Sequence, residues 1–330
     1  MLILLAARAP LRITLGGGGT DIPSYYSIYG GFSVTAAIDK YIYILAHDRF
    51  DPGFRVSYSK TEIVEKPEQI EHPIVREALR LLGPFDHLEL LSVADLPART
   101  GLGSSGAFTV ALLYALHNWK GEHVPPSVLA EEACHIAMDI LHEPSGKQDE
   151  YTSAFGGINS YSISMDGKVN VLPLRFSRAT VSELESELLL FYTGITRESR
   201  LILESQGKAA ASGDENTMKG LHKIKQIGID SRNSLEDGNL KEFGSLLNEH
   251  WKTKKLMTPK TTTPEIDAIY ELAMKNGATG GKIMGAGGGG FFMFHCDSDR
   301  RKLTEVLETH GLKRMKFRLE YEGSKTVINI

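Results

Sequence analysis

Cysteine is scarce in this sequence, because Cys134 and Cys296 are the only two thiols among 330 residues. One lies in a helical pattern and the other ends an apolar run, so they do not form the paired spacing of a zinc site. Such isolated cysteines are typical of buried thiols in a reducing compartment. We therefore expect a cytoplasmic protein without a zinc site.

Long apolar runs and an excess of basic residues are also missing. No segment approaches the roughly 20 apolar residues of a membrane span. The start, MLILLAAR, is too short and lacks the basic flank of a signal peptide, so we interpret it as a buried strand. The formal net charge of −4 argues against nucleic-acid binding by bulk electrostatics. We expect no membrane or nucleic-acid partner, and a homodimer remains open.

A Walker P-loop is absent as well. Four Gly-Lys pairs occur, but each is followed by a residue other than Ser or Thr: Gln148, Val169, Ala209 and Ile283. If the protein uses ATP, another glycine-rich loop must hold the phosphates.

Three glycine-rich segments are present instead, at residues 16–21 (GGGGTD), 101–106 (GLGSSG) and 285–290 (GAGGGG). A glycine loop that opens a helix can wrap an anion with backbone N–H groups at the positive end of the helix dipole. The middle segment also fits the dinucleotide pattern G-x-G-x-x-G. Its context disfavours that alternative, because residues 94–100 intervene after the preceding strand and no acidic residue ends a following strand.

Hydrophobic periodicity predicts mixed strands and helices along the chain. The expected strands are 32–38, 41–47, 54–59, 87–93, 158–163, 168–172, 188–193, 281–284, 290–295 and 314–321. The expected helices are 73–82, 105–119, 126–141, 146–154, 198–211, 217–236, 240–256, 264–275 and 299–310. This order predicts an α+β protein of two halves, 1–180 and 181–330, with a ligand cleft between them.

The glycine segments and their flanks resemble the three motifs of the GHMP kinases, the galactokinase, homoserine, mevalonate and phosphomevalonate kinase superfamily. The matching stretches are 12–21 (RITLGGGGTD), 97–106 (PARTGLGSSG) and 282–290 (KIMGAGGGG). They occur in the family's order and at its distances. The resemblance implies a two-domain α+β fold, with an N-terminal half like domain 2 of ribosomal protein S5 and a ferredoxin-like C-terminal half. It also implies a kinase that uses ATP and Mg²⁺.

Further stretches resemble one group within the superfamily, the D-glycero-D-manno-heptose 7-phosphate kinases. They are 59–62 (SKTE), 72–76 (HPIVR), 146–151 (GKQDEY), 155–159 (FGGIN) and 192–197 (YTGITR). This resemblance implies transfer of phosphate from ATP to the C1 hydroxyl of heptose 7-phosphate, giving the 1,7-bisphosphate. A kinase for fucose, galactose or an N-acetylhexosamine is the alternative within the class. An NAD-dependent oxidoreductase and a non-catalytic nucleotide- or sugar-binding relative are alternatives of other classes.

The resemblance assigns Asp149 the role of the catalytic aspartate, which accommodates the proton of the acceptor hydroxyl. Arg12 lies nine residues before Asp21, where galactokinase-like sequences place an arginine near the reacting oxygens. Its guanidinium would stabilise the transferring phosphoryl group, and Lys147 could share this task.

Substrate binding is predicted for the first glycine segment and for two later positions. Asp21 suits hydrogen bonds to sugar hydroxyls, although Thr20-Asp21 before a proline also suits a helix cap. Arg197 is the candidate for a distal phosphate, with Arg200 and Arg8 as alternatives. The predicted substrate-binding residues are Gly18, Gly19, Thr20, Asp21, Gly157 and Arg197.

The resemblance places ATP at Pro97, Gly101, Leu102, Gly103, Ser104, Ser105 and Gly106, with Gly287 and Gly288 behind them. It also makes Ser105 a magnesium ligand. Relatives carry an acidic residue near position 137, where this sequence has Ala137, so Asp139 is the predicted second ligand, with Glu132 or a water as alternatives. The stretch 248–254 (NEHWKTK) is interpreted as helix packing.

Overall fold

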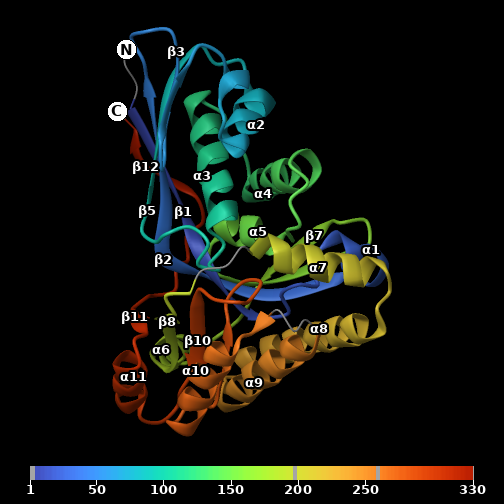
Figure 1. Ribbon diagram of the computed structural model, residues 1–330. Helices are drawn as coiled ribbons and strands as arrows, with labels where there is room; N and C mark the ends of the chain where they lie inside the picture. The colour runs from blue at the N-terminus through green and yellow to red at the C-terminus, as the bar shows by residue number, and fades with distance from the viewer. Residues whose placement is uncertain (1–3, 196–198, 258–260, 330) are drawn as a thin grey trace.

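The chain forms two sheets in the computed structural model, which describes residues 4–195, 199–257 and 261–329 (Figure 1). The first sheet has eight strands in the order β12-β1-β2-β5-β3-β4, with β6 and β7 attached to β2. Its strands are β1 (Leu4–Gly16), β2 (Gly31–Asp48), β3 (Gly53–Ser57), β4 (Thr61–Val64), β5 (His87–Ala94), β6 (Ile158–Ile163), β7 (Val169–Pro173) and β12 (Lys325–Asn329). All neighbours are antiparallel except β3 and β5, which run parallel.

Strand β2 is continuous over two segments that the sequence predicts as separate strands, 32–38 and 41–47. In its pairing with β1, Pro10 lies opposite Tyr41 and Leu11 lies opposite Ile38, so the two residues between Ile38 and Tyr41 have no partner on β1. This is a β-bulge, which bends a strand without ending it. The polar pair Asp39-Lys40 therefore marks a bulge where the sequence predicts a break between two strands.

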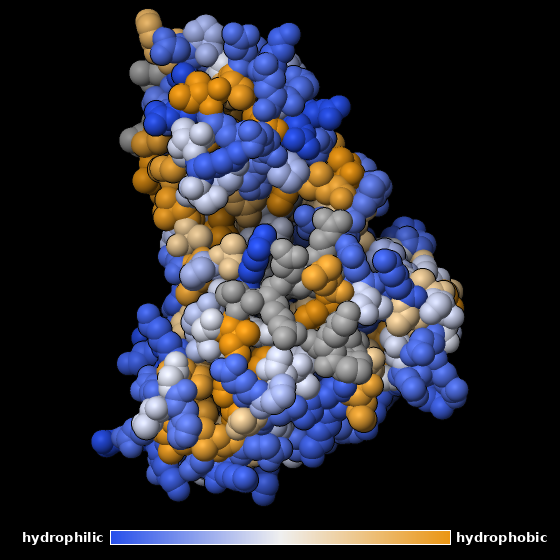
Figure 2. Space-filling model, viewed as in Figure 1, coloured by the Kyte–Doolittle hydropathy of each residue, from blue (hydrophilic) through white to orange (hydrophobic). Residues whose placement is uncertain are grey.

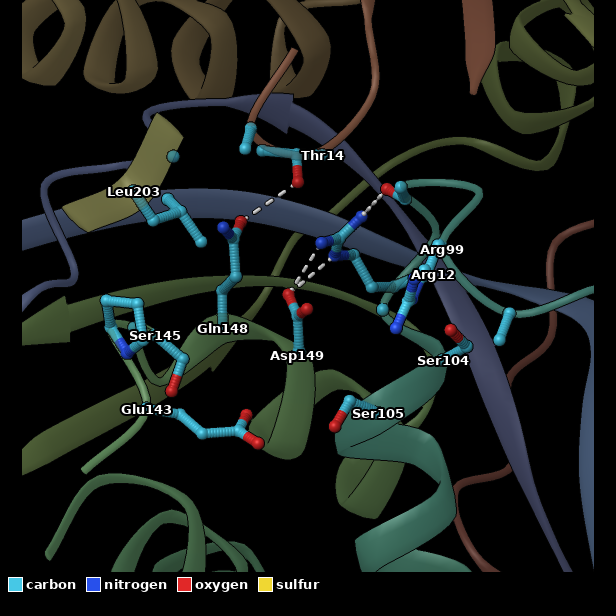
Figure 3. Close-up of a pocket in the computed structure, with 18 of the residues that line it drawn as sticks. Arg12, Thr14, Arg99, Ser104, Ser105, Glu143, Ser145, Gln148, Asp149 and Leu203 are labelled. Carbon is cyan, nitrogen blue, oxygen red and sulfur yellow. Dashed lines mark hydrogen bonds and ion pairs between the residues drawn. The ribbon is translucent and has the colours of Figure 1, made fainter. Parts of the chain in front are cut away.

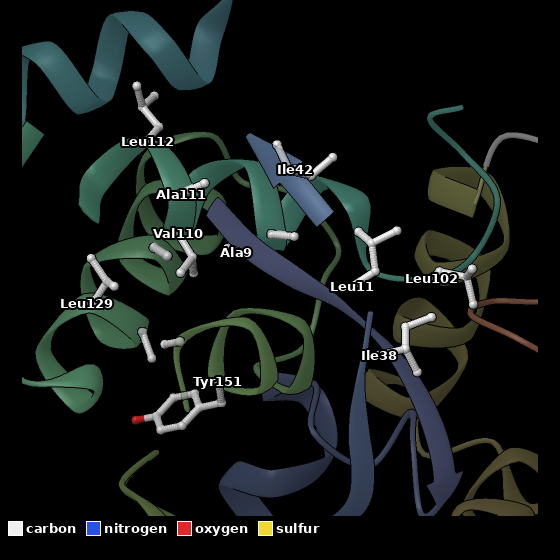
Figure 4. Packing of buried hydrophobic residues seen from close by; sticks show 14 of the residues in the cluster. Ala9, Leu11, Ile38, Ile42, Leu102, Val110, Ala111, Leu112, Leu129 and Tyr151 are labelled. Atoms are coloured by element: carbon white, nitrogen blue, oxygen red, sulfur yellow. The ribbon is translucent and has the colours of Figure 1, made fainter. Parts of the chain in front are cut away.

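Helices α2 (Pro73–Leu82), α3 (Ser104–Trp119), α4 (Pro126–Cys134) and α5 (Gln148–Phe155) pack beside the first sheet. Helix α3 is apolar on nearly every side because β1, β2, α2, α4 and α5 surround it. Figure 4 shows Val110, Ala111 and Leu112 of this helix among buried residues of the neighbouring elements. The predicted helix 126–141 is confirmed, but its last part, His135–Ile140, is π-helical.

The second sheet has the antiparallel order β11-β8-β10-β9. Its strands are β8 (Leu188–Tyr192), β9 (Gly280–Ile283), β10 (Phe291–His295) and β11 (Lys313–Met315). Aromatic side chains fill the adjoining core: Phe191, Trp251, Tyr270, Phe292 and Phe294. The remaining helices are α1 (Pro23–Tyr29), α6 (Arg178–Glu187), α7 (Ser199–Ala211), α8 (Glu215–Glu236), α9 (Leu240–Met257), α10 (Pro264–Lys275) and α11 (Arg300–Thr309).

The outer surface of the molecule is consistent with a core filled by apolar side chains. Figure 2 shows hydrophilic side chains over most of one face, with apolar side chains in scattered patches. None of the described helices combines the length and the apolar character that a membrane span needs.

The end of the chain returns to the first sheet. The predicted strand 314–321 is wrong in length, because β11 covers only three residues. After it the chain bridges to β2 through Leu319 and Ile38, and β12 then pairs with β1. A division at residue 180 stays a prediction, and the last strand belongs to the sheet of the first half.

Candidate active site

A cavity of about 860 Å³ lies where the three glycine segments meet. Gly18 and Gly19 come from the first segment, Gly101 and Gly103 from the second, and Gly285 from the third. Helices α5, α7 and α9 add side chains to the same wall. The sequence therefore brings residues more than 260 positions apart into one site.

Arg12 and Asp149 form the central contact of this cavity (Figure 3). Arg12 is 3% exposed on β1, and its Nε and Nη2 atoms each lie 2.7 Å from Oδ1 of Asp149. Its Nη1 donates to the carbonyl oxygen of Gly101 at 2.7 Å. The guanidinium therefore fixes the carboxylate of α5 against the loop that begins α3.

Asp21 is held by backbone amides at the edge of the same cavity. Its carboxyl accepts from the N–H of Gly19 at 2.8 Å and from the N–H of Gln148 at 3.1 Å. Burial raises the pKa of Asp21, and the negative charge of Asp149 raises it further. The Gln148 side chain accepts from the Thr14 hydroxyl at 2.9 Å. These contacts fix the orientation of the carboxyl toward the cavity.

Glu150 lies buried behind Asp149 and is 4% exposed. Within the described residues its Oε2 has no hydrogen-bond partner. Burial and the nearby charge of Asp149 raise the pKa of Glu150 to about 8. This carboxyl is therefore largely protonated at neutral pH and adds little negative charge to the site.

The second and third glycine segments pack directly against each other. A Cβ atom on Gly101 would lie 2.5 Å from the carbonyl oxygen of Met284, and one on Gly285 would lie 2.9 Å from Cα of Gly101. The N–H of Phe291 also donates to the carbonyl of Thr100 at 3.2 Å. Glycine is needed here because the two backbones approach too closely for a side chain. The third segment therefore supports the loop at the start of α3.

Most of the predicted catalytic and binding residues lie together in this cavity. The residues that line it are Arg12, Gly18, Gly19, Asp21, Pro97, Gly101, Gly103, Ser104, Ser105 and Asp149. Leu102 is fully buried beneath them, and Gly106 lies in the first turns of α3 where the helix meets Asp149.

Other predicted residues have different surroundings. The Thr20 hydroxyl is fully buried and donates to the carbonyl of Phe32 at 2.7 Å. Gly157 accepts from the N–H of Ala37 and donates to the carbonyl of Glu320. Gly288, next to Gly287, donates to the carbonyl of Thr261. None of these four residues lines the cavity. Arg197 falls outside the described residues.

Lys147 and Asp139 point to a second cavity of about 420 Å³. Lys147 Nζ donates to both carboxylate oxygens of Glu131 and to the carbonyl of Gly167, each at 2.8 Å. Asp139 contacts His135 at 2.8 Å on the same π-helical stretch. The structure therefore separates both predicted residues from Arg12 and Ser105.

Glu143 is an acidic side chain that the sequence reasoning missed. Figure 3 shows its carboxyl and the Ser105 side chain pointing toward the same part of the cavity. Both are hard oxygen donors of the kind that Mg²⁺ prefers. Glu143 lies six residues after Ala137, in the loop that follows the helix, so position along the helix could not identify it.

Basic side chains on the opposite part of the chain also line the cavity and were missed. Lys254 and His250 come from α9, within the stretch interpreted as helix packing, and Lys282 comes from β9. The neighbouring Trp251 is fully buried in the aromatic core, as that interpretation requires. His250 and Lys254 lie four residues apart and therefore share one face of α9, which is rotated from the direction of Trp251.

Two family models match parts of the chain. The GHMP kinases N terminal domain matches residues 72–157, and the GHMP kinases C terminal domain matches residues 231–311. A D-glycero-alpha-D-manno-heptose 7-phosphate kinase from Campylobacter jejuni is 30% identical over 98% of this chain and 98% of its own length. The chain belongs to the GHMP kinase family. The predicted family and ATP-dependent phosphotransferase class are confirmed.

Solved structures of GHMP kinases share the fold of this GHMP kinase. A D-glycero-D-manno-heptose 1-phosphate kinase from Bacteroides thetaiotaomicron has a TM-score of 0.80 at 26% identity, covering 98% of this chain and 99% of the other. A galactokinase from Lactococcus lactis in complex with galactose has a TM-score of 0.77 at 20% identity, covering 98% and 95%. The predicted α+β GHMP kinase fold is therefore confirmed.

Proposed function

We propose that this GHMP kinase is a sugar kinase that transfers phosphate from ATP to the C1 hydroxyl of D-glycero-D-manno-heptose 7-phosphate. The product is the 1,7-bisphosphate. The observation that carries the proposal is the Arg12–Asp149 pair beside the loop of residues 101–106. The choice of acceptor is supported by the heptose 7-phosphate kinase that shares 30% identity with the chain.

Transfer in this site is an in-line displacement. The C1 oxygen forms a bond to the γ-phosphorus of ATP while the bond from that phosphorus to the β-γ bridging oxygen breaks, and ADP leaves. Asp149 accepts the proton of the hydroxyl or stabilises it as it leaves. The Arg12 guanidinium orients Asp149 and offsets the negative charge of the transferring group.

The nucleotide phosphates bind at the loop of residues 101–106. Helix α3 spans 16 residues, and its N-terminal residues Ser104 and Ser105 face the cavity. The free N–H groups of a helix start and the positive end of its dipole favour an anion there. We infer that Gly103, Ser104 and Ser105 hold the triphosphate through these groups.

We infer that Ser105 and Glu143 hold Mg²⁺, and that Asp139 does not. The two side chains face one space, whereas Asp139 lines the second cavity. Mg²⁺ bound with ATP neutralises charge on the phosphates.

Turnover of ATP with a panel of free and phosphorylated hexoses and heptoses tests the proposal, with the product's phosphate position read by phosphorus NMR. A C1 phosphate formed from heptose 7-phosphate is the expected result. Strong turnover of an unphosphorylated sugar, such as fucose or galactose, would replace the acceptor and keep the kinase. No ATP use with any sugar would remove the sugar kinase from consideration.

A further inference from the structure

Positive charge accumulates on the wall of the cavity that α9 and β9 form. Lys254 and Lys282 both line the cavity, and Arg12 lies beside them on β1. Arg12 is paired with Asp149. Within residues 4–195, 199–257 and 261–329, neither lysine forms an ion pair with a carboxylate.

Lys254 is fixed by a neutral acceptor. Its Nζ donates to the carbonyl oxygen of Gly285 at 2.6 Å, which leaves two of the three N–H donors of an ammonium for a ligand. The side chain is half-buried and its open side faces the cavity. Burial and the nearby charge of Arg12 lower the pKa of Lys254 to about 8, while the charge of Asp21 opposes this shift.

Lys282 lies deeper, at 4% exposure, with His250 as its partner. Its Nζ lies 3.3 Å from Nδ1 of His250, and an ammonium can only donate in such a contact. Burial lowers the pKa of both groups well below their usual values, and each is lowered further by the charge of Lys254. The charged forms of the two lysines therefore disfavour each other, and a bound anion would favour both.

Buried like charges of this kind are costly unless a ligand of opposite charge compensates them. We propose that Lys254 and Lys282 form a phosphate subsite that binds the distal phosphate of the acceptor. The inference rests on the acceptor proposed above. It assigns to described residues the binding of the distal phosphate, for which the sequence analysis predicts Arg197.

The position of the subsite favours the acceptor over the nucleotide. The ATP phosphates have their own binding groups in the N–H donors at the start of α3. Lys254 instead lies within electrostatic reach of Asp21, the carboxyl predicted to bind sugar hydroxyls. Asp21, Arg12, Lys282 and His250 are the charged or titratable groups described around it.

Steady-state kinetics of Lys254→Met test the proposal. We expect the KM for heptose 7-phosphate to rise about tenfold or more, since a charge-assisted hydrogen bond is lost, while the KM for ATP changes little. The preference for heptose 7-phosphate over free heptose should fall by the same factor. Lys254→Arg should keep most of the preference for heptose 7-phosphate. Lys252→Met, an exposed residue of the same helix, is the matched control.

Two outcomes of these kinetics would overturn the subsite. An equal rise in the KM for ATP would assign the lysines to the nucleotide. An unchanged KM for heptose 7-phosphate would leave them no role in acceptor binding.

Calorimetry with inorganic phosphate separates failure of the subsite from failure of the proposed function. Phosphate binding should raise the pKa of Lys254 above about 8 and take up protons near that pH, so the heat should depend on the buffer's ionisation enthalpy. Lys254→Met should bind phosphate about tenfold more weakly or worse. If the kinase ignores the phosphate of its acceptor, the proposed function fails and this titration alone decides the subsite. Equal phosphate binding by the wild type and by Lys254→Met would contradict the proposed phosphate subsite.

Discussion

At the scale of single residues, the Arg12–Asp149 pair connects three segments of the chain, namely β1, α5 and the loop at Gly101. One guanidinium contacts the carboxylate of α5 and the carbonyl of Gly101, so charge placement and loop position depend on the same side chain. Asp149→Asn keeps the size and one oxygen acceptor while it removes the charge. We expect kcat to fall by about 10²–10⁴, with ATP binding retained, in a coupled ADP-release assay.

The matched control for this change is Asp166→Asn, which removes an exposed carboxylate outside the main cavity. Because this change lies on the surface and away from the main cavity, kcat should stay within about twofold of the wild-type value. Retained activity in Asp149→Asn would remove Asp149 from the catalytic role.

Gly106 decides how closely α3 approaches Asp149, the proposed catalytic carboxylate. A Cβ atom at this position would lie 2.8 Å from Cβ of Asp149 and 3.0 Å from the backbone N of Glu150. We expect Gly106→Ala to displace Asp149, to lower kcat about tenfold or more, and to cost about 1–3 kcal/mol of stability. Urea unfolding and steady-state kinetics measure both effects.

Gly207→Ala provides the comparison, because Gly207 lies in helix α7 and an added Cβ meets no atom within 4 Å. That change should be neutral or stabilise the helix by up to about 1 kcal/mol. Equal behaviour of the two variants would contradict the close approach at Gly106.

At the scale of elements, His295 joins β10 to the end of α6. Its Nε2 lies 3.0 Å from Glu187 Oε2, and its Nδ1 lies 2.6 Å from the Thr279 hydroxyl. Burial lowers the pKa of His295 to about 4, below the ordinary value of 6.5. The unfolded chain therefore binds a proton more readily between these values, and this contribution to stability is lost as the pH falls from about 6.5 toward 4.

His295→Gln isolates that contribution, because burial raises the pKa of Glu187 and acts in the opposite direction. Between pH 7 and 5, the wild type should lose on the order of 1 kcal/mol more of its unfolding free energy than the variant. Parallel pH profiles in urea unfolding would show that His295 does not carry the effect.

Most elements could be predicted because their periodicity is local. The helix Pro73–Leu82 and the helix Pro264–Lys275 begin and end where the sequence predicts. Strand β2 could not be predicted as one strand, since Asp39 and Lys40 resemble a turn unless β1 lies alongside. Helix α6 and strand β12 were missed, because α6 has a weak apolar pattern and β12 is stabilised by pairing with β1.

The cavity residues also divide into those that the sequence could predict and those that it could not. Arg12, Asp21 and Asp149 stand in motifs, so their sequence context identifies them. Glu143, Lys254 and Lys282 reach the cavity only through the packing of a loop, α9 and β9. Lys147 directly precedes α5 near Asp149, yet its ion pair with Glu131 turns it to the second cavity. Spacing along the chain cannot determine such a direction.

At the scale of the whole molecule, the cavity takes residues from both sheets' surroundings, so ligand binding should stabilise the entire chain. At 100 times its Kd, ATP with magnesium should add about 2.7 kcal/mol to the unfolding free energy. Asp149→Asn should show the same gain, because it removes the charge of one carboxylate and leaves the loop of residues 101–106 intact. Thermal unfolding with and without nucleotide measures this, and no shift would contradict nucleotide binding at this cavity.

Strand β12 gives the kinase a constraint during its synthesis. Its partner β1 leaves the ribosome more than 300 residues before β12 does. Until then one edge of β1, the strand that carries Arg12, has no neighbour and could pair with another nascent chain. Arg12, the predicted catalytic arginine, thus lies on a strand that gains its second neighbour only after β12 has been synthesised.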